Sequence, residues 1–70
     1  MNAAAKIPAV GETFAIKGSQ CMVYMGDTIE VRHVDTLAVQ KVIPMTDKMR
    51  EQLPAQYAHH LGSIRGDGVR

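Results

Sequence analysis

The sequence lacks tryptophan and holds one cysteine, one phenylalanine and two tyrosines. With Cys21 alone, no internal disulfide bond can form, and a zinc site built from several cysteines is excluded. No apolar run approaches the length of a membrane-spanning helix, and the first ten residues lack the apolar stretch of a secretory signal peptide. We therefore expect a protein of the reducing cytoplasm that has no membrane partner.

A strong charge of one sign is also absent. Eight Lys and Arg residues stand against seven Asp and Glu residues, which gives a formal net charge of +1. Proteins held on nucleic acid mainly by phosphate contacts usually carry a clear basic excess. Seventy residues form one small domain with a limited core, so contact with a partner or with a second copy would add stability. A homodimer is one such arrangement.

Alternating apolar and polar residues from Glu12 onward predict a series of short strands. Phe14 and Ile16 share one predicted face of the first strand, and turn-forming residues separate it from the next two strands. A fourth strand, with the sequence LAVQKVI, ends at Pro44. Three or four strands joined by tight turns describe an antiparallel β-meander.

The turn at Gly26 leaves the register of the central hairpin open. A two-residue loop pairs Tyr24 with Ile29, whereas a loop with an odd number of residues places Cys21 opposite His33. Two-residue loops are commoner, and we favour that register. Because both faces of the second strand are apolar, the sheet is expected to be strongly coiled or covered on both sides.

After Pro44 the apolar spacing changes to that of a helix. Thr46 is a plausible N-cap, and Met49 and Leu53 lie four residues apart on one apolar stripe. Pro54 either kinks one long helix or begins a second one. Gly62 is the expected C-terminal cap.

These elements predict an α+β fold: a small antiparallel sheet that coils toward a barrel, followed by a C-terminal helical segment. Residues 11–62 form the single expected domain. Residues 1–10 are expected to be a flexible N-terminal arm, and residues 63–70 a flexible C-terminal tail.

Two groups of residues suggest chemistry, and neither is convincing. Cys21 and His33 would form a nucleophile–base pair only in the odd-loop register. His59 and His60 point about 100° apart on a helix and cannot hold one metal ion as a pair four residues apart can. We expect no enzymatic activity, no metal site and no cofactor.

Binding is therefore the expected activity, through the sheet edge, its outward face and the helical segment. The positions expected to contact a partner are Lys17, Tyr24, Arg32, Lys41, Lys48, Arg50 and Tyr57.

Residues 11–34 resemble the small β-barrel module of Mu-like and TniA-like transposases, which has an SH3-like barrel fold. The matching positions are Gly11, Phe14, Ile16, Gly18, Val23, Gly26, Asp27, Thr28, Ile29, Val31 and Arg32. This resemblance implies a small barrel and an origin in a phage or mobile element, and it transfers no activity. The compartment would then be the host cytoplasm.

The expected function is that of a non-enzymatic small binding protein. It would be an accessory protein that binds a larger host protein complex and modulates or inhibits it. One alternative is a nucleic-acid-binding or transcription-regulating module, whose affinity should fall steeply as salt rises. A second alternative is a small structural subunit of a virion, which would form ordered homo-oligomers.

Overall fold

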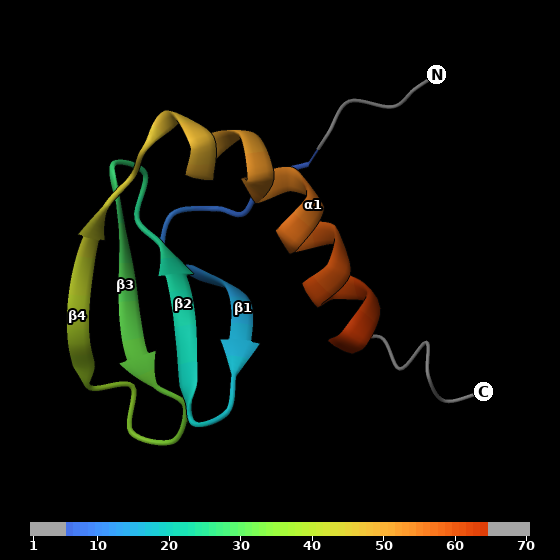
Figure 1. Cartoon of the computed structure of the whole chain (residues 1–70). Coiled ribbons are helices and arrows are strands. Elements are labelled where there is room, and N and C mark those ends of the chain that lie inside the picture. The colour runs from blue at the N-terminus through green and yellow to red at the C-terminus, as the bar shows by residue number, and fades with distance from the viewer. Residues whose placement is uncertain (1–5, 65–70) are drawn as a thin grey trace.

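The structure is a computed structural model that describes residues 6–64, with side chains as far as residue 62. Within these residues, four strands are followed by one helix (Figure 1). Their bounds are β1, Glu12–Lys17; β2, Gln20–Tyr24; β3, Thr28–His33; β4, Val39–Pro44; and α1, Asp47–Ile64.

The strands form one antiparallel sheet in the order β1-β2-β3-β4. The predicted α+β fold, a β-meander followed by a helix, is confirmed. Within the described chain the sheet stays open, because β1 and β4 are its two edges. Of the expected arm and tail, residues 1–5 and 65–70 lie outside the described residues.

The hairpin of β2 and β3 has the favoured two-residue loop. Tyr24 pairs with Ile29, and the Met25 N–H donates a hydrogen bond of 2.9 Å to the Thr28 carbonyl. Gly26 takes the first central position of the turn with a φ of 89°, a conformation that glycine adopts without a steric penalty. The two-residue register is therefore confirmed.

A β-bulge interrupts the pairing of β1 with β2 between Thr13 and Ala15. The bulge lets Phe14 enter the core, where it is 1% exposed. Ile16 pairs with Cys21 on the opposite face of the sheet and is 52% exposed. The prediction that Phe14 and Ile16 share one face is therefore wrong, because the bulge changes the alternation between them.

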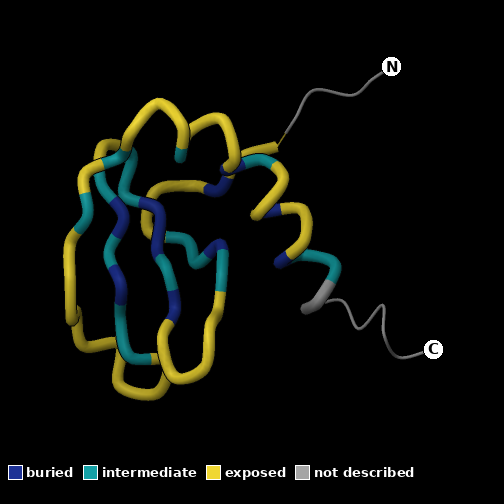
Figure 2. Tube along the Cα trace, in the orientation of Figure 1, coloured by how far each residue is buried: buried dark blue, intermediate teal, exposed yellow. Residues whose placement is uncertain are grey.

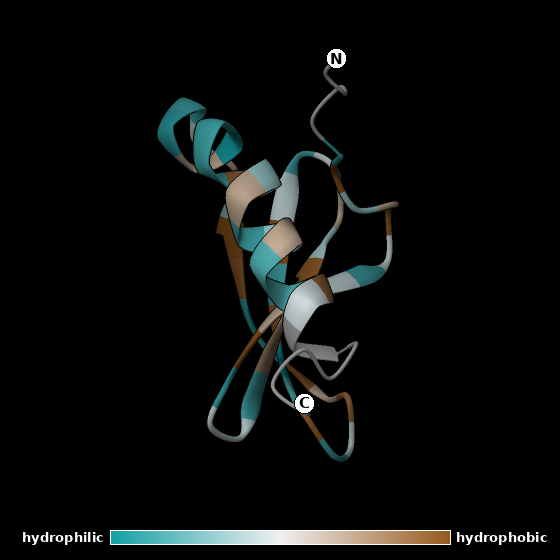
Figure 3. Ribbon diagram, turned by 90° about the vertical axis from the view of Figure 1, so that its right-hand side faces the viewer, coloured by the Kyte–Doolittle hydropathy of each residue, from teal (hydrophilic) through white to brown (hydrophobic). Residues whose placement is uncertain are grey.

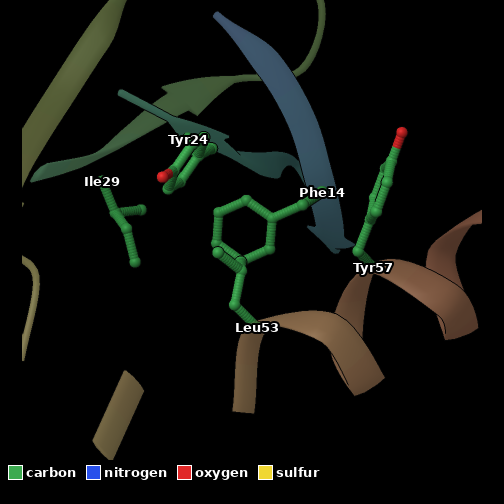
Figure 4. Close-up of a cluster of buried hydrophobic side chains, with 5 residues drawn as sticks. All are labelled: Phe14, Tyr24, Ile29, Leu53 and Tyr57. Atoms are coloured by element: carbon green, nitrogen blue, oxygen red, sulfur yellow. The ribbon is translucent and has the colours of Figure 1, made fainter. Parts of the chain in front are cut away.

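The core lies between one face of the sheet and α1. Figure 4 shows Phe14 at its centre, with two residues of β2 and β3 on one side and two residues of α1 on the other. Figure 2 shows that buried residues concentrate in β2 and β3, whereas β4 is mostly exposed. The five core residues are Phe14, Tyr24, Ile29, Leu53 and Tyr57.

The helix α1 begins after the predicted cap. The Met49 N–H donates to Thr46 Oγ1 over 3.1 Å, which satisfies one of the free amides of the first turn. The helix continues through Pro54 and bends along its length (Figure 1), as expected where proline removes a helical hydrogen bond. It also passes Gly62 and ends at Ile64, so the predicted cap at Gly62 is wrong.

Seen from the side of α1, much of the helix ribbon has the colours of hydrophilic or neutral residues, and more strongly apolar segments lie in the strands (Figure 3). The apolar residues of α1 that pack against one face of the sheet are Leu53 and Tyr57. Within residues 6–64, no helix is both long enough and apolar enough to cross a membrane.

Candidate functional site

The strand register defines a second face of the sheet, opposite α1, which we call the outer sheet face. It carries apolar residues from the edge strands and from β2, and a pair of oppositely charged residues from β3. Its members are Ile16, Cys21, Val23, Glu30, Arg32, Val39 and Val42, and the register adds Thr13 and Thr28 toward one end.

An ion pair occupies the middle of the outer sheet face. Arg32 Nε donates to Glu30 Oε1 over 2.9 Å, and Arg32 Nη2 contacts the same oxygen. The register places Arg32 beside Cys21 and Glu30 beside Val23, and both of these small side chains are buried. Each charged side chain is mostly removed from water, so the pair is a fixed polar element of this face.

Beyond the ion pair, the face ends in exposed valines. Val39 pairs with Arg32 and Val42 pairs with Glu30, and the two valines are 51% and 53% exposed. An exposed sheet face normally carries polar side chains, because water solvates it. On β4 the valines instead extend the apolar character of the outer sheet face to its edge.

The turn before β4 presents a further apolar side chain. Leu37 is 55% exposed and has a φ of 63°, in the left-handed region that disfavours branched and bulky residues. Its N–H donates a 2.8 Å hydrogen bond to the His33 carbonyl, which fixes the turn. The turn therefore holds an exposed leucine in a conformation that glycine or asparagine would adopt more easily.

A groove with a volume of about 720 Å³ lies between β1 and α1, and we call it the β1–α1 groove. One wall is formed by residues 14–17 of β1, with Met22 behind them. The other wall is a stretch of α1 that follows Pro54, formed by Ala55, Gln56, His59 and His60.

A hydrogen bond joins β1 and α1 near this groove. Tyr57 Oη donates to Glu12 Oε2 over 2.5 Å, and the Ala9 N–H donates to Glu12 Oε1 over 2.8 Å. The bond from Tyr57 is the main cause that lowers the pKa of Glu12, and the bond to Glu12 raises the pKa of Tyr57. Both oxygens of this carboxylate are thus occupied by partners within the chain.

The lysine and arginine residues predicted to contact a partner lie on separate parts of the structure. Lys17 lines the β1–α1 groove, while Arg32 belongs to the outer sheet face. Lys41, Lys48 and Arg50 are exposed on β4 and the first turn of α1. In Figure 1 the end of β1 and the start of α1 lie at opposite ends of the sheet, so these cations do not form one basic patch.

The two predicted aromatic contacts lie in the core. Tyr24 and Tyr57 are each only 7% exposed and pack with Phe14 and Leu53. The expectation that they lie on accessible surfaces is wrong, because the domain uses its few aromatic rings to fill the space between the sheet and α1.

Cys21 and His33 are not opposed to each other. In the observed register Cys21 pairs with Arg32 and His33 pairs with Gln20, so the two side chains point to opposite faces. His33 Nδ1 instead accepts a 3.1 Å hydrogen bond from the Asp35 N–H. Across residues 6–64, no three His, Cys, Asp or Glu side chains are grouped as metal ligands.

Sequence reasoning missed the exposed apolar residues around β4, because it treated this segment only as the fourth strand of the meander and did not ask which of its apolar side chains lack cover. Leu37, Val39 and Val42 are all more than half exposed. The signal available was position: the last strand of an open meander has only one neighbour. Comparison of the chain with protein-family models, with curated proteins and with solved structures found no match. The resemblance to transposase modules stays a prediction.

Proposed function

We propose that this chain is a non-enzymatic binding protein that recognises a protein partner through the outer sheet face. The observation that supports the proposal most is that Val39 and Val42 are more than half exposed beside a fixed Glu30–Arg32 ion pair. Exposed apolar groups around a specific polar contact are the usual composition of a protein interface. The ion pair would set the orientation of the partner, and the valines would supply buried area.

The free edge of β4 supports the same proposal. This strand pairs with β3 on one side only, so its outward backbone groups are available to another strand. Leu37, at the start of this edge, adds an exposed side chain whose backbone conformation is costly. A partner that pairs with β4 would contact Leu37, Val39 and Val42 together.

The wider proposal concerns the partner. Small size and the resemblance of residues 11–34 to transposase modules favour an accessory protein of a phage or mobile element, which modulates or inhibits a larger host complex in the host cytoplasm. Lys17, Lys41 and Lys48 lie on different parts of the molecule and do not form one basic surface. A protein partner is therefore favoured over a nucleic acid bound through its phosphates.

The test is a tagged pull-down from host lysate after nuclease treatment, with three forms of the protein. Wild type is compared with Val42→Lys, which places a charge on the outer sheet face. The matched control is Ile7→Lys, because Ile7 is also 53% exposed and lies outside the sheet. We expect a stoichiometric protein that wild type and Ile7→Lys retain and Val42→Lys loses.

Three other results would contradict the proposal. A partner retained equally by Val42→Lys would place the interface elsewhere. Loss of every partner after nuclease treatment would indicate a nucleic-acid-binding module. A large ordered homo-oligomer without other partners, seen by light scattering, would indicate a structural subunit.

A further inference from the structure

We propose that the β1–α1 groove is a second binding site, which takes an extended acidic segment of another protein as an added strand on β1. This inference does not rest on the proposed function, because the groove is lined mainly by β1 and α1, whereas the ion pair and the exposed valines that support the proposed function lie on β3 and β4. Ile16 of β1 belongs to both surfaces. The shape of the groove, its free backbone and its charge each support the proposal.

The strand wall of the groove shows that it runs along a sheet edge. Four consecutive residues, 14–17, line it. Consecutive side chains of a strand point to opposite faces, apart from the bulge at Phe14, so one pocket reaches all four only where it lies against the edge of the strand. The groove therefore exposes the backbone of β1 as well as its side chains.

That backbone has free hydrogen-bonding groups. Because β1 pairs only with β2, half of its N–H and C=O groups point away from the sheet, toward the groove. Among the described residues, no backbone hydrogen bond outside the strand ladder uses residues 13–17. An extended peptide could pair with these groups, as peptides do in other domains that bind by strand addition.

The helix wall leaves room for such a peptide. Residues four apart lie on the same side of a helix. Ala55 and His59 form one such pair in the helix wall, and Gln56 and His60 form the adjacent pair. Ala55 carries only a methyl group, so it takes little of the volume of the groove. Apolar side chains of an added strand would contact Phe14 and Met22, which also line the groove.

The charge of the groove selects an acidic occupant. Its lining contains Lys17 and two imidazoles, His59 and His60, and it contains no Asp or Glu. Glu12, a carboxylate close enough to His60 to interact with it electrostatically, already accepts hydrogen bonds from Ala9 and Tyr57. His60 is 9% exposed and makes no side-chain hydrogen bond to another described residue. Among the described residues no buried side-chain nitrogen or oxygen lacks a partner, so the His60 ring nitrogens reach solvent, where a carboxylate of the peptide could accept a hydrogen bond from the ring.

The test uses the full chain and two short fluorescein-labelled peptides, one with alternating valine and glutamate and one with alternating valine and lysine. Fluorescence anisotropy should show that the acidic peptide binds at least about tenfold more tightly than the basic peptide. Lys17→Glu should reverse or abolish this preference, while Lys48→Glu, an exposed lysine outside the groove, should leave it unchanged.

A second pair of variants separates the groove from a general charge effect. Ala55→Trp fills the groove and should weaken binding by about tenfold or more, since the ring occupies the path of the peptide. Ala58→Trp is the matched control, because Ala58 is exposed on the same helix and does not line the groove. Equal affinity of both tryptophan variants would overturn the proposal.

Amide exchange measured by NMR tests strand addition directly. With the acidic peptide bound, the outward amides of residues 13–17 should exchange more slowly, and the amides of β4 should not change. Perturbation limited to Lys17, His59 and His60, without slower exchange in β1, would show binding of an anion alone and overturn the peptide proposal. Failure of the outer-face pull-down would leave this result unaffected.

Discussion

Tyr57 of α1 donates a hydrogen bond to Glu12 of β1 across 2.5 Å, although the two residues are 45 positions apart in the chain. The bond joins β1 to α1 at the border of the core. Figure 4 shows the Tyr57 ring packed against the core cluster with its hydroxyl pointing away from it. The side chain therefore fills space with its ring and fixes the position of α1 with its hydroxyl group.

Tyr57→Phe should destabilise the protein at neutral pH, and the loss of stability should become smaller as the pH falls. The hydrogen bond lowers the pKa of Glu12 from its usual value of 4.5, so it contributes stability above that value. This contribution is lost as the pH falls through the lowered pKa of the folded state. Thermal unfolding of both forms from neutral to acidic pH should show the difference in Tm shrinking. A difference that does not vary with pH would contradict this account.

Leu37→Gly should raise the free energy of unfolding by about 0.5 to 1 kcal/mol, because glycine adopts a positive φ without the clash that a Cβ atom causes. Little buried surface is lost, since Leu37 is 55% exposed. The control is Leu37→Ala, which removes the same side chain and keeps the strained conformation, so it should bring no gain. Urea denaturation measures both. If Leu37 contacts the partner, Leu37→Gly also weakens the pull-down described above.

Leu53→Ala should lower the free energy of unfolding by about 2 to 5 kcal/mol, the usual cost of emptying a fully buried leucine site. Leu53 is 2% exposed and packs against Phe14, so the cavity would open at the centre of the core. Met49→Ala is the comparison, because Met49 is only partly buried against the same cluster. Denaturant unfolding should show a clearly smaller loss for Met49→Ala, and equal losses would refute the assignment of the core.

Thr46→Ala should cost about 1 kcal/mol of stability, because it removes the oxygen that accepts from the Met49 N–H. Thr46→Ser keeps a hydroxyl group at the cap and should be nearly neutral. Circular dichroism during thermal unfolding checks both. Equal loss in the two variants would mean that the methyl group of Thr46, and not its oxygen, supports α1.

The sequence predicted those features that depend on local chemistry. Gly26 sets the two-residue turn and hence the pairing of Tyr24 with Ile29, and Thr46 begins α1. Features that depend on tertiary packing were not predictable in this way. The bulge at Phe14 has no distinctive residue type, and it becomes favourable only because it brings a large ring under α1.

The continuity of α1 and the position of the candidate sites also depend on tertiary packing, so the sequence did not predict them. Leu53 and Tyr57 lie before and after Pro54 and both pack in the core. Their packing keeps α1 continuous, although Pro54 has no N–H to donate a helical hydrogen bond. The β1–α1 groove joins segments about forty residues apart, so no local pattern could reveal it. Lys17 was expected at a binding surface for its charge alone, and its place at the end of the groove comes only from the docking of α1.

Because β1 and α1 share one core, the order of synthesis opposes the order of assembly. A nascent chain emerges from the ribosome with its first strand exposed, and Phe14 has no partner on α1 until Leu53 and Tyr57 have left the exit tunnel. The meander can form its hairpins earlier, but the Phe14 ring stays open to water until α1 has emerged and packs on it. A chain that lacks α1 would therefore leave Phe14 exposed and would be open to proteolysis.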